Sequence, residues 1–213
     1  LSHPLRERAR AEVRASVGVA DDAVALLYCG RLIGRKGVDT LLRAVARVRH
    51  ATDRRTEHVR VLLAGDGPDR SALEALASDA GVRDSVHFLG FRQPADLPDV
   101  FAAADAFVLP SHAEGWGVVV TEAMAAGLPV LASDSVNAAA DLVRDGENGW
   151  RFPARADARL AELIHDVAAD PCRRASMGAR SRAAIRCETP AIAAPRFVQI
   201  LEAAAEGRPL QPL

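Results

Sequence analysis

Two carboxylates with seven residues between them, Glu114 and Glu122, lie in the most informative stretch of the chain. An apolar, strand-like run over 106–109 ends at Pro110, and a helix-like pattern covers 118–126. The pattern therefore places Glu114 in a strand-to-helix loop and Glu122 one turn inside the helix that follows.

The chemistry that suits this arrangement is recognition of an anion that carries hydroxyl groups on both sides. A helix N-terminus attracts anions through its free amides, and Gly115 and Gly117 let the backbone approach a ligand closely. A diphosphate between a ribose and a sugar fits, with Glu122 accepting from the ribose and Glu114 from the transferred sugar. The alternative is an ordinary loop glutamate followed by an ordinary helical one.

A second loop, over 30–37, supplies cations that suit the same ligand. Arg31 and Lys36 stand five residues apart in it, and Lys36 is the only lysine among 27 basic residues. Arg31 could bind a phosphate pair through two donors and Lys36 as a compact charge. The loop contains neither a Walker sequence nor G-x-G-x-x-G, which disfavours nucleoside triphosphate hydrolysis and dinucleotide-dependent dehydrogenation.

Strand-like and helix-like segments alternate through most of the chain, which predicts an α/β fold. The pattern is typical of a doubly wound, Rossmann-like parallel sheet of about six strands with C-terminal helices. Each glycine-rich or charged loop leaves the carboxyl end of a strand, the edge at which such sheets bind ligands. The expected strands are 24–29, 59–64, 86–89, 106–109, 130–133 and 149–152, and the expected helices are 5–17, 38–49, 69–80, 97–103, 118–126, 138–143, 157–169, 172–186 and 191–206.

We expect three parts: a lead-in helix or linker over 1–22, the Rossmann-like domain over 23–190, and a C-terminal helix and tail over 191–213. Since Leu1 is not an initiator methionine, we also expect the chain to be part of a longer protein.

Composition narrows the class of partner and compartment. A net charge of -1, a pI near 6.7 and no basic cluster interleaved with aromatics argue against nucleic acid. No apolar run reaches the roughly 18 residues of a membrane span, and the six histidines show no metal-ligand spacing. Cys29, Cys172 and Cys187 are scattered and odd in number, which suits free thiols and a cytoplasmic location.

The chain resembles the nucleotide-sugar-binding half of GT-B glycosyltransferases, most of all the retaining family 4 group, glycosyl transferases group 1. The resemblance covers about residues 24–155, and the helices of the tail fit it too. It is carried by segments that occur in the family's order: Gly30-Arg31, Lys36-Gly37, Phe88-Leu89-Gly90, Ala104-Asp105, Pro110-Ser111, Glu114 through Glu122, and Gly127-Leu128-Pro129.

The resemblance assigns roles to particular positions. It implies that Arg31 and Lys36 bind the diphosphate, that Glu122 binds the ribose and that Glu114 faces the donor sugar. Further donor-binding positions follow from it: the amides of Trp116, Gly117 and Val118 at the sugar and phosphate, Gly90 and Phe91 beside the base, and Gly30, Gly115 and Thr121 nearby. The chain departs from the family at Trp116, where phenylalanine is common, and over 136–141, where Gly and Pro are replaced.

By this resemblance, the expected activity is transfer of a hexose, with retention, from a nucleotide diphosphate sugar to an acceptor. Arg31, Lys36 and Glu114 would be the catalytic groups, the leaving phosphate would take the acceptor's proton, and no metal or other cofactor is expected. The acceptor, a lipid, glycan or small molecule, is left open. An acceptor-binding domain is expected before this one, and the full-length enzyme could be peripheral to a membrane.

Two other functions stay open. One is a non-catalytic nucleotide-sugar-binding module or regulatory subunit. The other is a glycosidase using Glu114 and Glu122 as its acid and nucleophile, which the accompanying phosphate-binding cations disfavour.

Overall fold

The computed structural model describes residues 3–51, 56 and 58–186, and their centre is one six-stranded parallel sheet. Its strands follow the order β3-β2-β1-β4-β5-β6. The predicted strands are confirmed, with β3 one residue longer than expected. They are β1 (Val24–Cys29), β2 (Val59–Ala64), β3 (Val86–Gly90), β4 (Ala106–Leu109), β5 (Val130–Ser133) and β6 (Gly149–Phe152).

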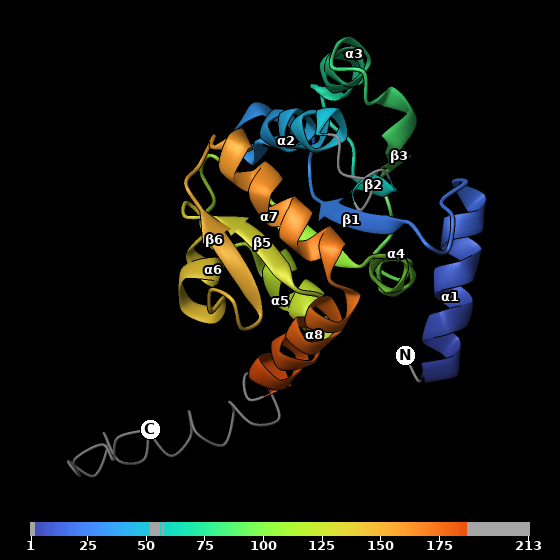
Figure 1. The fold of residues 1–213 in the computed structure, drawn as a ribbon, viewed down its shortest axis with the longest axis vertical. Coiled ribbons are helices and arrows are strands. Elements are labelled where there is room, and N and C mark those ends of the chain that lie inside the picture. The colour runs from blue at the N-terminus through green and yellow to red at the C-terminus, as the bar shows by residue number, and fades with distance from the viewer. Residues whose placement is uncertain (1–2, 52–55, 57, 187–213) are drawn as a thin grey trace, which may run out of the picture.

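Helices cover both faces of this sheet (Figure 1). Three pairs of helices pack against each other: α2 with α7, α1 with α4, and α5 with α8. Their bounds agree with the predicted helices to within two residues at each end. They are α1 (His3–Ser16), α2 (Val38–His50), α3 (Arg70–Asp79), α4 (Leu97–Ala103), α5 (Val118–Ala125), α6 (Asn137–Leu142), α7 (Asp157–Ala169) and α8 (Pro171–Arg186).

The predicted helix over 191–206 and the residue Cys187 lie outside the described residues. None of the helices in the described part of the chain is both long and apolar enough to cross a bilayer.

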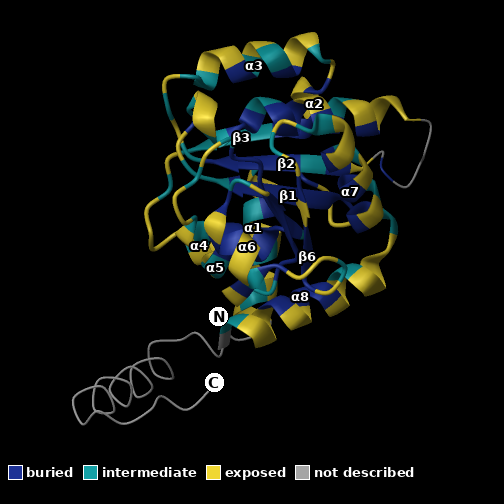
Figure 2. Cartoon of the chain, turned by 90° about the vertical axis from the view of Figure 1, so that its left-hand side faces the viewer, coloured by how far each residue is buried: buried dark blue, intermediate teal, exposed yellow. Residues whose placement is uncertain are grey.

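The apolar strands form the core, as their sequences predict. Every residue of β4 and β5 is buried, and β1 is buried from Val24 to Tyr28. Figure 2 shows these strands as a buried layer between helices whose outer faces are exposed. Strands buried on both faces have no polar side, which explains their continuous rather than alternating hydrophobicity.

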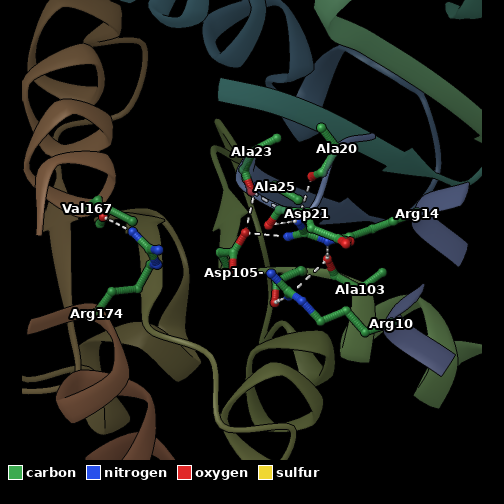
Figure 3. Close-up of polar contacts among 11 residues, drawn as sticks. Arg10, Arg14, Ala20, Asp21, Ala23, Ala25, Ala103, Asp105, Val167 and Arg174 are labelled. Carbon is green, nitrogen blue, oxygen red and sulfur yellow. Dashed lines mark hydrogen bonds and ion pairs between the residues drawn. The ribbon is translucent and has the colours of Figure 1, made fainter. Parts of the chain in front are cut away.

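An arginine of α1 ties this helix to the sheet (Figure 3). The side chain of Arg14 is 1% exposed and donates to Asp105, at the start of β4, over 2.5 Å. It also donates to the main-chain oxygens of Ala20, Asp21, Ala23 and Ala103. Asp105 in turn accepts from Arg10 at 2.9 Å and from the amide of Ala25 at 2.8 Å. The lead-in helix is therefore fixed to both central strands.

The strand order reverses direction between β1 and β4, which pair directly through Leu26 with Ala106 and Leu27 with Phe107. The chain runs outward from β1 to β3 on one side and from β4 to β6 on the other. In open α/β sheets the loops at such a switch point separate and leave a crevice for ligands. The loops that follow β1 and β4 are the two that contain the predicted site.

Candidate functional site

The loop after β1 and the loop after β4 are joined by hydrogen bonds. The amides of His112 and Ala113 donate to the carbonyl of Arg35, at 2.8 and 3.3 Å, and the Arg35 side chain returns a bond to the Ala113 carbonyl at 3.3 Å. Thr40 Oγ1 lies 3.0 Å from His112 Nε2. Burial lowers the pKa of His112, the charge of Arg155 adds to this, and Asp39 opposes it. The ring is therefore neutral at pH 7.

The two loops also touch through their backbones at Gly37. This residue ends a short 3-10 turn over Gly34–Lys36 and precedes α2, with a left-handed φ of 66°. A side-chain carbon added there would lie 2.0 Å from the carbonyl oxygen of Pro110. Only glycine permits both the backbone angle and the contact. The predicted flexible loop is thus a turn held against its neighbour.

This contact brings two of the predicted catalytic residues together. Lys36 Nζ forms an ion pair with Glu114 Oε2, with the side chains only 14% and 11% exposed. Ser111 Oγ is 3.4 Å from the same carboxylate oxygen. A pair shielded to this degree is screened by salt much less than a surface pair. Each charge is held in place by the other.

The amino end of α5 has no cap from a side chain. Gly117 precedes the helix in a left-handed conformation, φ 91°, and has no side chain that could cap the first amides. The first amides of a helix have no acceptor within it, so they remain available to a ligand. Asn137 Nδ2 donates to the Gly115 carbonyl at 2.5 Å, and the Ala138 amide donates to the Trp116 carbonyl at 2.9 Å. The start of α6 therefore fixes this loop, although its sequence departs from the family pattern.

The side chains around this helix start differ in their freedom. Trp116 and Val118 are 45% and 62% exposed, unusual values for large apolar residues. Glu122 is exposed, and its carboxylate makes no hydrogen bond or ion pair with any residue that the structure describes. Thr121 Oγ1 donates to the Val118 carbonyl at 2.7 Å, so its hydroxyl is already used within the helix.

A pocket of about 510 Å³ opens beside this centre, at the carboxyl ends of β1, β2 and β3. Phe91, 70% exposed, forms part of its wall, and its predicted place beside a base stays a prediction. Gly90 does not line it, and its carbonyl accepts the Gly65 amide at 2.8 Å instead. The lining residues are Cys29, Gly30, Arg31, Ala64, Gly65, Asp66, Phe91, Arg92, Pro94 and Leu97.

Sequence reasoning did not predict that the residues after β2 and the residues after Phe91 line the pocket. Gly65 and Asp66 were visible as a glycine-rich loop after a strand, but no role was attached to them. In the structure an added side-chain carbon on Gly65 would lie 1.9 Å from the Gly30 carbonyl oxygen. Loop packing of this kind leaves no signal in spacing along the chain.

The last residues of β1 shape the wall between pocket and ion pair. Tyr28 is fully buried, and its hydroxyl donates to the carbonyl of Arg31 at 2.8 Å. Burial raises the pKa of this phenol, so it stays a donor at all ordinary pH. Burial also raises the pKa of Cys29 to about 11, with Glu122 adding to the rise and Lys36 opposing it. Glu122 and Lys36 therefore both act electrostatically on the end of β1.

Within the described ranges, no group of three His, Cys, Asp or Glu residues could hold a metal ion. What the structure does bring together is a lysine-glutamate ion pair, an uncapped helix start and, beside them, one largely apolar pocket. The ion pair of Lys36 and Glu114 and the start of α5 lie at the switch point. Arg31, which follows β1 in the same loop as Lys36, forms part of the wall of the pocket.

Fold and site together define one Rossmann-like half of a GT-B glycosyltransferase. The family model described as glycosyl transferases group 1 matches residues 9–195, and the chain belongs to this family.

Curated relatives agree with this assignment over most of the chain. It is 37% identical over 180 residues to a D-inositol 3-phosphate glycosyltransferase of Streptomyces scabiei, covering 82% of this chain and 40% of the relative. It is 34% identical over 165 residues to alpha-D-kanosaminyltransferase of Streptomyces kanamyceticus, covering 78% and 41%. A GDP-mannose-dependent alpha-(1-6)-phosphatidylinositol monomannoside mannosyltransferase of Mycobacterium tuberculosis is 34% identical over 181 residues, covering 82% and 46%. The chain thus spans less than half the length of these relatives.

Solved structures show the same correspondence. HepE of Anabaena in complex with UDP superposes with a TM-score of 0.79 and 26% identity, over 92% of this chain and 53% of that one. Sucrose-phosphate synthase of Thermosynechococcus elongatus superposes with a TM-score of 0.76 and 30% identity, over 91% and 49%.

Proposed function

We propose that this chain is the donor-binding half of a retaining glycosyltransferase, which transfers a hexose from a nucleotide diphosphate sugar to an acceptor. The observation that carries the proposal is the meeting of Lys36, Glu114 and the uncapped start of α5 at the switch point of the sheet. Relatives whose names or structures specify GDP-mannose, UDP or UDP-glucose support the class of donor.

The diphosphate would lie between the loop after β1 and the start of α5. Arg31 and Lys36 would bind its oxygens, and the first amides of α5 would point at the same charge. Negative charge grows on the diphosphate as the sugar leaves, so donors fixed in advance stabilise the transition state more than the ground state. No metal ion is required for this role, and the leaving phosphate can take the acceptor's proton.

The nucleoside would extend from the diphosphate toward β3. Glu122 is exposed and unpaired among the described residues, which suits a carboxylate that accepts from both ribose hydroxyls. The pocket beside Phe91 would receive the base, because an apolar recess with an exposed ring suits a flat aromatic ligand. The proposal thus uses the whole carboxyl edge from β3 to α5.

The sugar would lie at Glu114, on the side of the diphosphate opposite the ribose. Because Glu114 is paired with Lys36, the donor phosphate must compete with this carboxylate for Lys36. We infer that donor binding opens this pair, leaving Glu114 to accept from sugar hydroxyls and Lys36 to bind phosphate. Trp116 would form part of the sugar pocket.

Calorimetric titration of this chain with UDP, GDP and ADP tests donor binding directly. Binding of none of the three would contradict the proposed function. Incubation with nucleotide sugars and a panel of acceptors, followed by mass spectrometry, then separates two functions by the fate of the donor: hydrolysis supports a transferase, and an unchanged donor supports a non-catalytic nucleotide-sugar-binding module. We expect slow hydrolysis rather than efficient transfer by these residues alone, since positioning the second reactant supplies about 7–11 kcal/mol of such a barrier. On the evidence of its cysteines, we place the protein in the cytoplasm.

A further inference from the structure

The wall of the pocket at β3 contains an arginine without a partner. Arg92 is half-buried, and no hydrogen bond or ion pair joins it to any other residue in the part of the chain that the structure describes. Its Nε is buried and unbonded. A buried donor without an acceptor is costly, so such groups in a folded protein call for an explanation.

Neighbouring arginines do not share this property. Arg70 and Arg83 each lie over the ring of Phe88, at 5.7 and 5.5 Å. Arg70 also bonds to Glu74 at 3.0 Å, and Arg83 donates to the Val86 carbonyl at 3.0 Å. The isolation of Arg92 is therefore local to the pocket.

The other charged residues of the lining leave the base end to Arg92. Arg31 is at the end of β1, beside the proposed diphosphate site. Asp66 accepts the Gly67 amide at 2.8 Å and lies 3.4 Å from Arg70, so its carboxylate is already engaged. Arg92 follows β3, two strands from β1 in the sheet and thus about 10 Å away at the usual spacing of about 4.8 Å. A ligand anchored by its phosphates at β1 reaches Arg92 with its base.

We propose that Arg92 determines base specificity by donating to a ring carbonyl of the nucleobase. Guanidinium groups bind guanine at O6 and N7 through two parallel bonds, whereas adenine presents an amino donor in place of O6. The site therefore prefers bases with a carbonyl at this position, guanine, hypoxanthine or uracil, over adenine and cytosine. Phe91, next in sequence, supplies an apolar face for the ring, and Arg92 reads its edge. The inference rests on the proposed function.

Two pairs of nucleoside diphosphates test the effect of the base carbonyl. Inosine diphosphate and adenosine diphosphate differ only at the base edge in question, and uridine and cytidine diphosphates differ in the same sense. We expect the unaltered chain to bind the carbonyl member of each pair about tenfold more tightly, the size of effect that a good arginine contact produces. In Arg92→Ala both preferences should vanish, and in Arg92→Lys they should be reduced.

Arg159→Ala is the matched control. Arg159 is an exposed arginine of α7 that pairs with Glu162 at 2.6 Å and lines no part of this pocket. It should keep both preferences. Thermal unfolding of each variant checks that the fold is unchanged, and Arg92→Met, which keeps the apolar stem and removes every donor, provides a second substitution if the alanine variant unfolds.

Each result decides the matter. Equal affinity for both members of each pair, or a preference that persists in Arg92→Ala or Arg92→Met, overturns the role of Arg92 and leaves the proposed function standing. A uniform loss for all four diphosphates with the preference retained means that Arg92 contacts phosphate, which also overturns it. Failure of the unaltered chain to bind any diphosphate removes the proposed function, and this inference with it.

Discussion

Lys36 and Glu114 form an ion pair between the loop after β1 and the loop after β4, across the point where the strand order reverses. The pair joins the cation to which we assign the phosphate and the carboxylate to which we assign the sugar. The affinity for a nucleotide sugar therefore reflects the difference between the bonds that the ligand gains and the Lys36–Glu114 ion pair that it replaces.

Lys36→Ala should weaken binding of nucleoside diphosphates roughly ten- to a hundredfold, because charge-assisted bonds contribute about 1.5–3 kcal/mol. The unpaired carboxylate of Glu114 would then also repel the phosphates. Calorimetry with UDP and GDP measures the loss. Arg35→Ala removes a cation from the same turn whose side chain reaches only the Ala113 carbonyl, and it should weaken binding much less. Unchanged affinity in Lys36→Ala would exclude its phosphate role.

Glu114→Ala should separate two classes of ligand. It frees Lys36, so free nucleoside diphosphates should bind at least as tightly as before. The nucleotide sugar should bind more weakly, because it loses the acceptor for its hydroxyl groups. Parallel titrations with UDP and UDP-glucose, or with GDP and GDP-mannose, compare the two. A loss of equal size for both ligands would contradict the placement of the sugar at Glu114.

Glu122→Ala should weaken the binding of free nucleoside diphosphates and of nucleotide sugars alike, since both kinds of ligand contain the ribose. The expected loss is again roughly tenfold or more for two hydroxyl groups that donate to one carboxylate. A 2′-deoxynucleoside diphosphate is the matched ligand, and the alanine variant should discriminate against it less than the unaltered chain does. Full discrimination in the variant would show that another residue binds the ribose.

Most of the fold could be predicted from the sequence, because several strands are continuous apolar runs that alternate with helical patterns and end at glycine or proline. The six predicted strands and the helices of the described part are found within two residues of their expected ends. Strand order was not predicted, since it depends on packing between segments far apart in sequence. It is the order that places the loops of Lys36 and Glu114 side by side.

The site was predicted less completely than the fold. The sequence predicted that Lys36 binds phosphate and that Glu114 binds the sugar, each separately. It gave no sign that the two side chains form an ion pair with each other. The pocket depends on Gly65 and Asp66, which follow β2, and on Arg92, which follows β3. These residues are brought together by the pairing of the two strands, which the spacing along the chain does not show. The roles assigned to Arg31, Glu122 and the amides of α5 stay predictions, and the variants above test several of them.

Cys29 should react slowly with alkylating reagents at neutral pH. Its pKa is raised to about 11, so about one thiol in ten thousand is the reactive thiolate at pH 7. The labelling rate should rise about tenfold for each pH unit between 7 and 10 and fall when a nucleoside diphosphate fills the pocket. Peptide mass spectrometry follows the reaction, with exposed Cys172 as the internal reference. Equal rates for both thiols at pH 7 would contradict the burial of Cys29.

Arg14→Met should lower the free energy of unfolding by about 3–5 kcal/mol, the usual cost of removing one partner of a buried ion pair. The variant leaves Asp105 with only Arg10 and the Ala25 amide, and four main-chain oxygens lose a donor. Urea denaturation measures the change. Arg8→Met, on the exposed side of the same helix, is the control and should change stability little. Equal stability in both variants would show that α1 is not fixed through Arg14.

The contact of Gly37 with the Pro110 carbonyl affects how donor preference can be altered, in evolution or by design. The loop after β1 and the loop after β4 share one interface, so we expect that neither can be replaced by a loop of another length or shape while the other stays. Chimaeras within the family should therefore retain their fold when both segments come from the same parent and lose it when they come from different ones. The two loops are one structural unit, although more than seventy residues separate Gly37 from Pro110 along the chain.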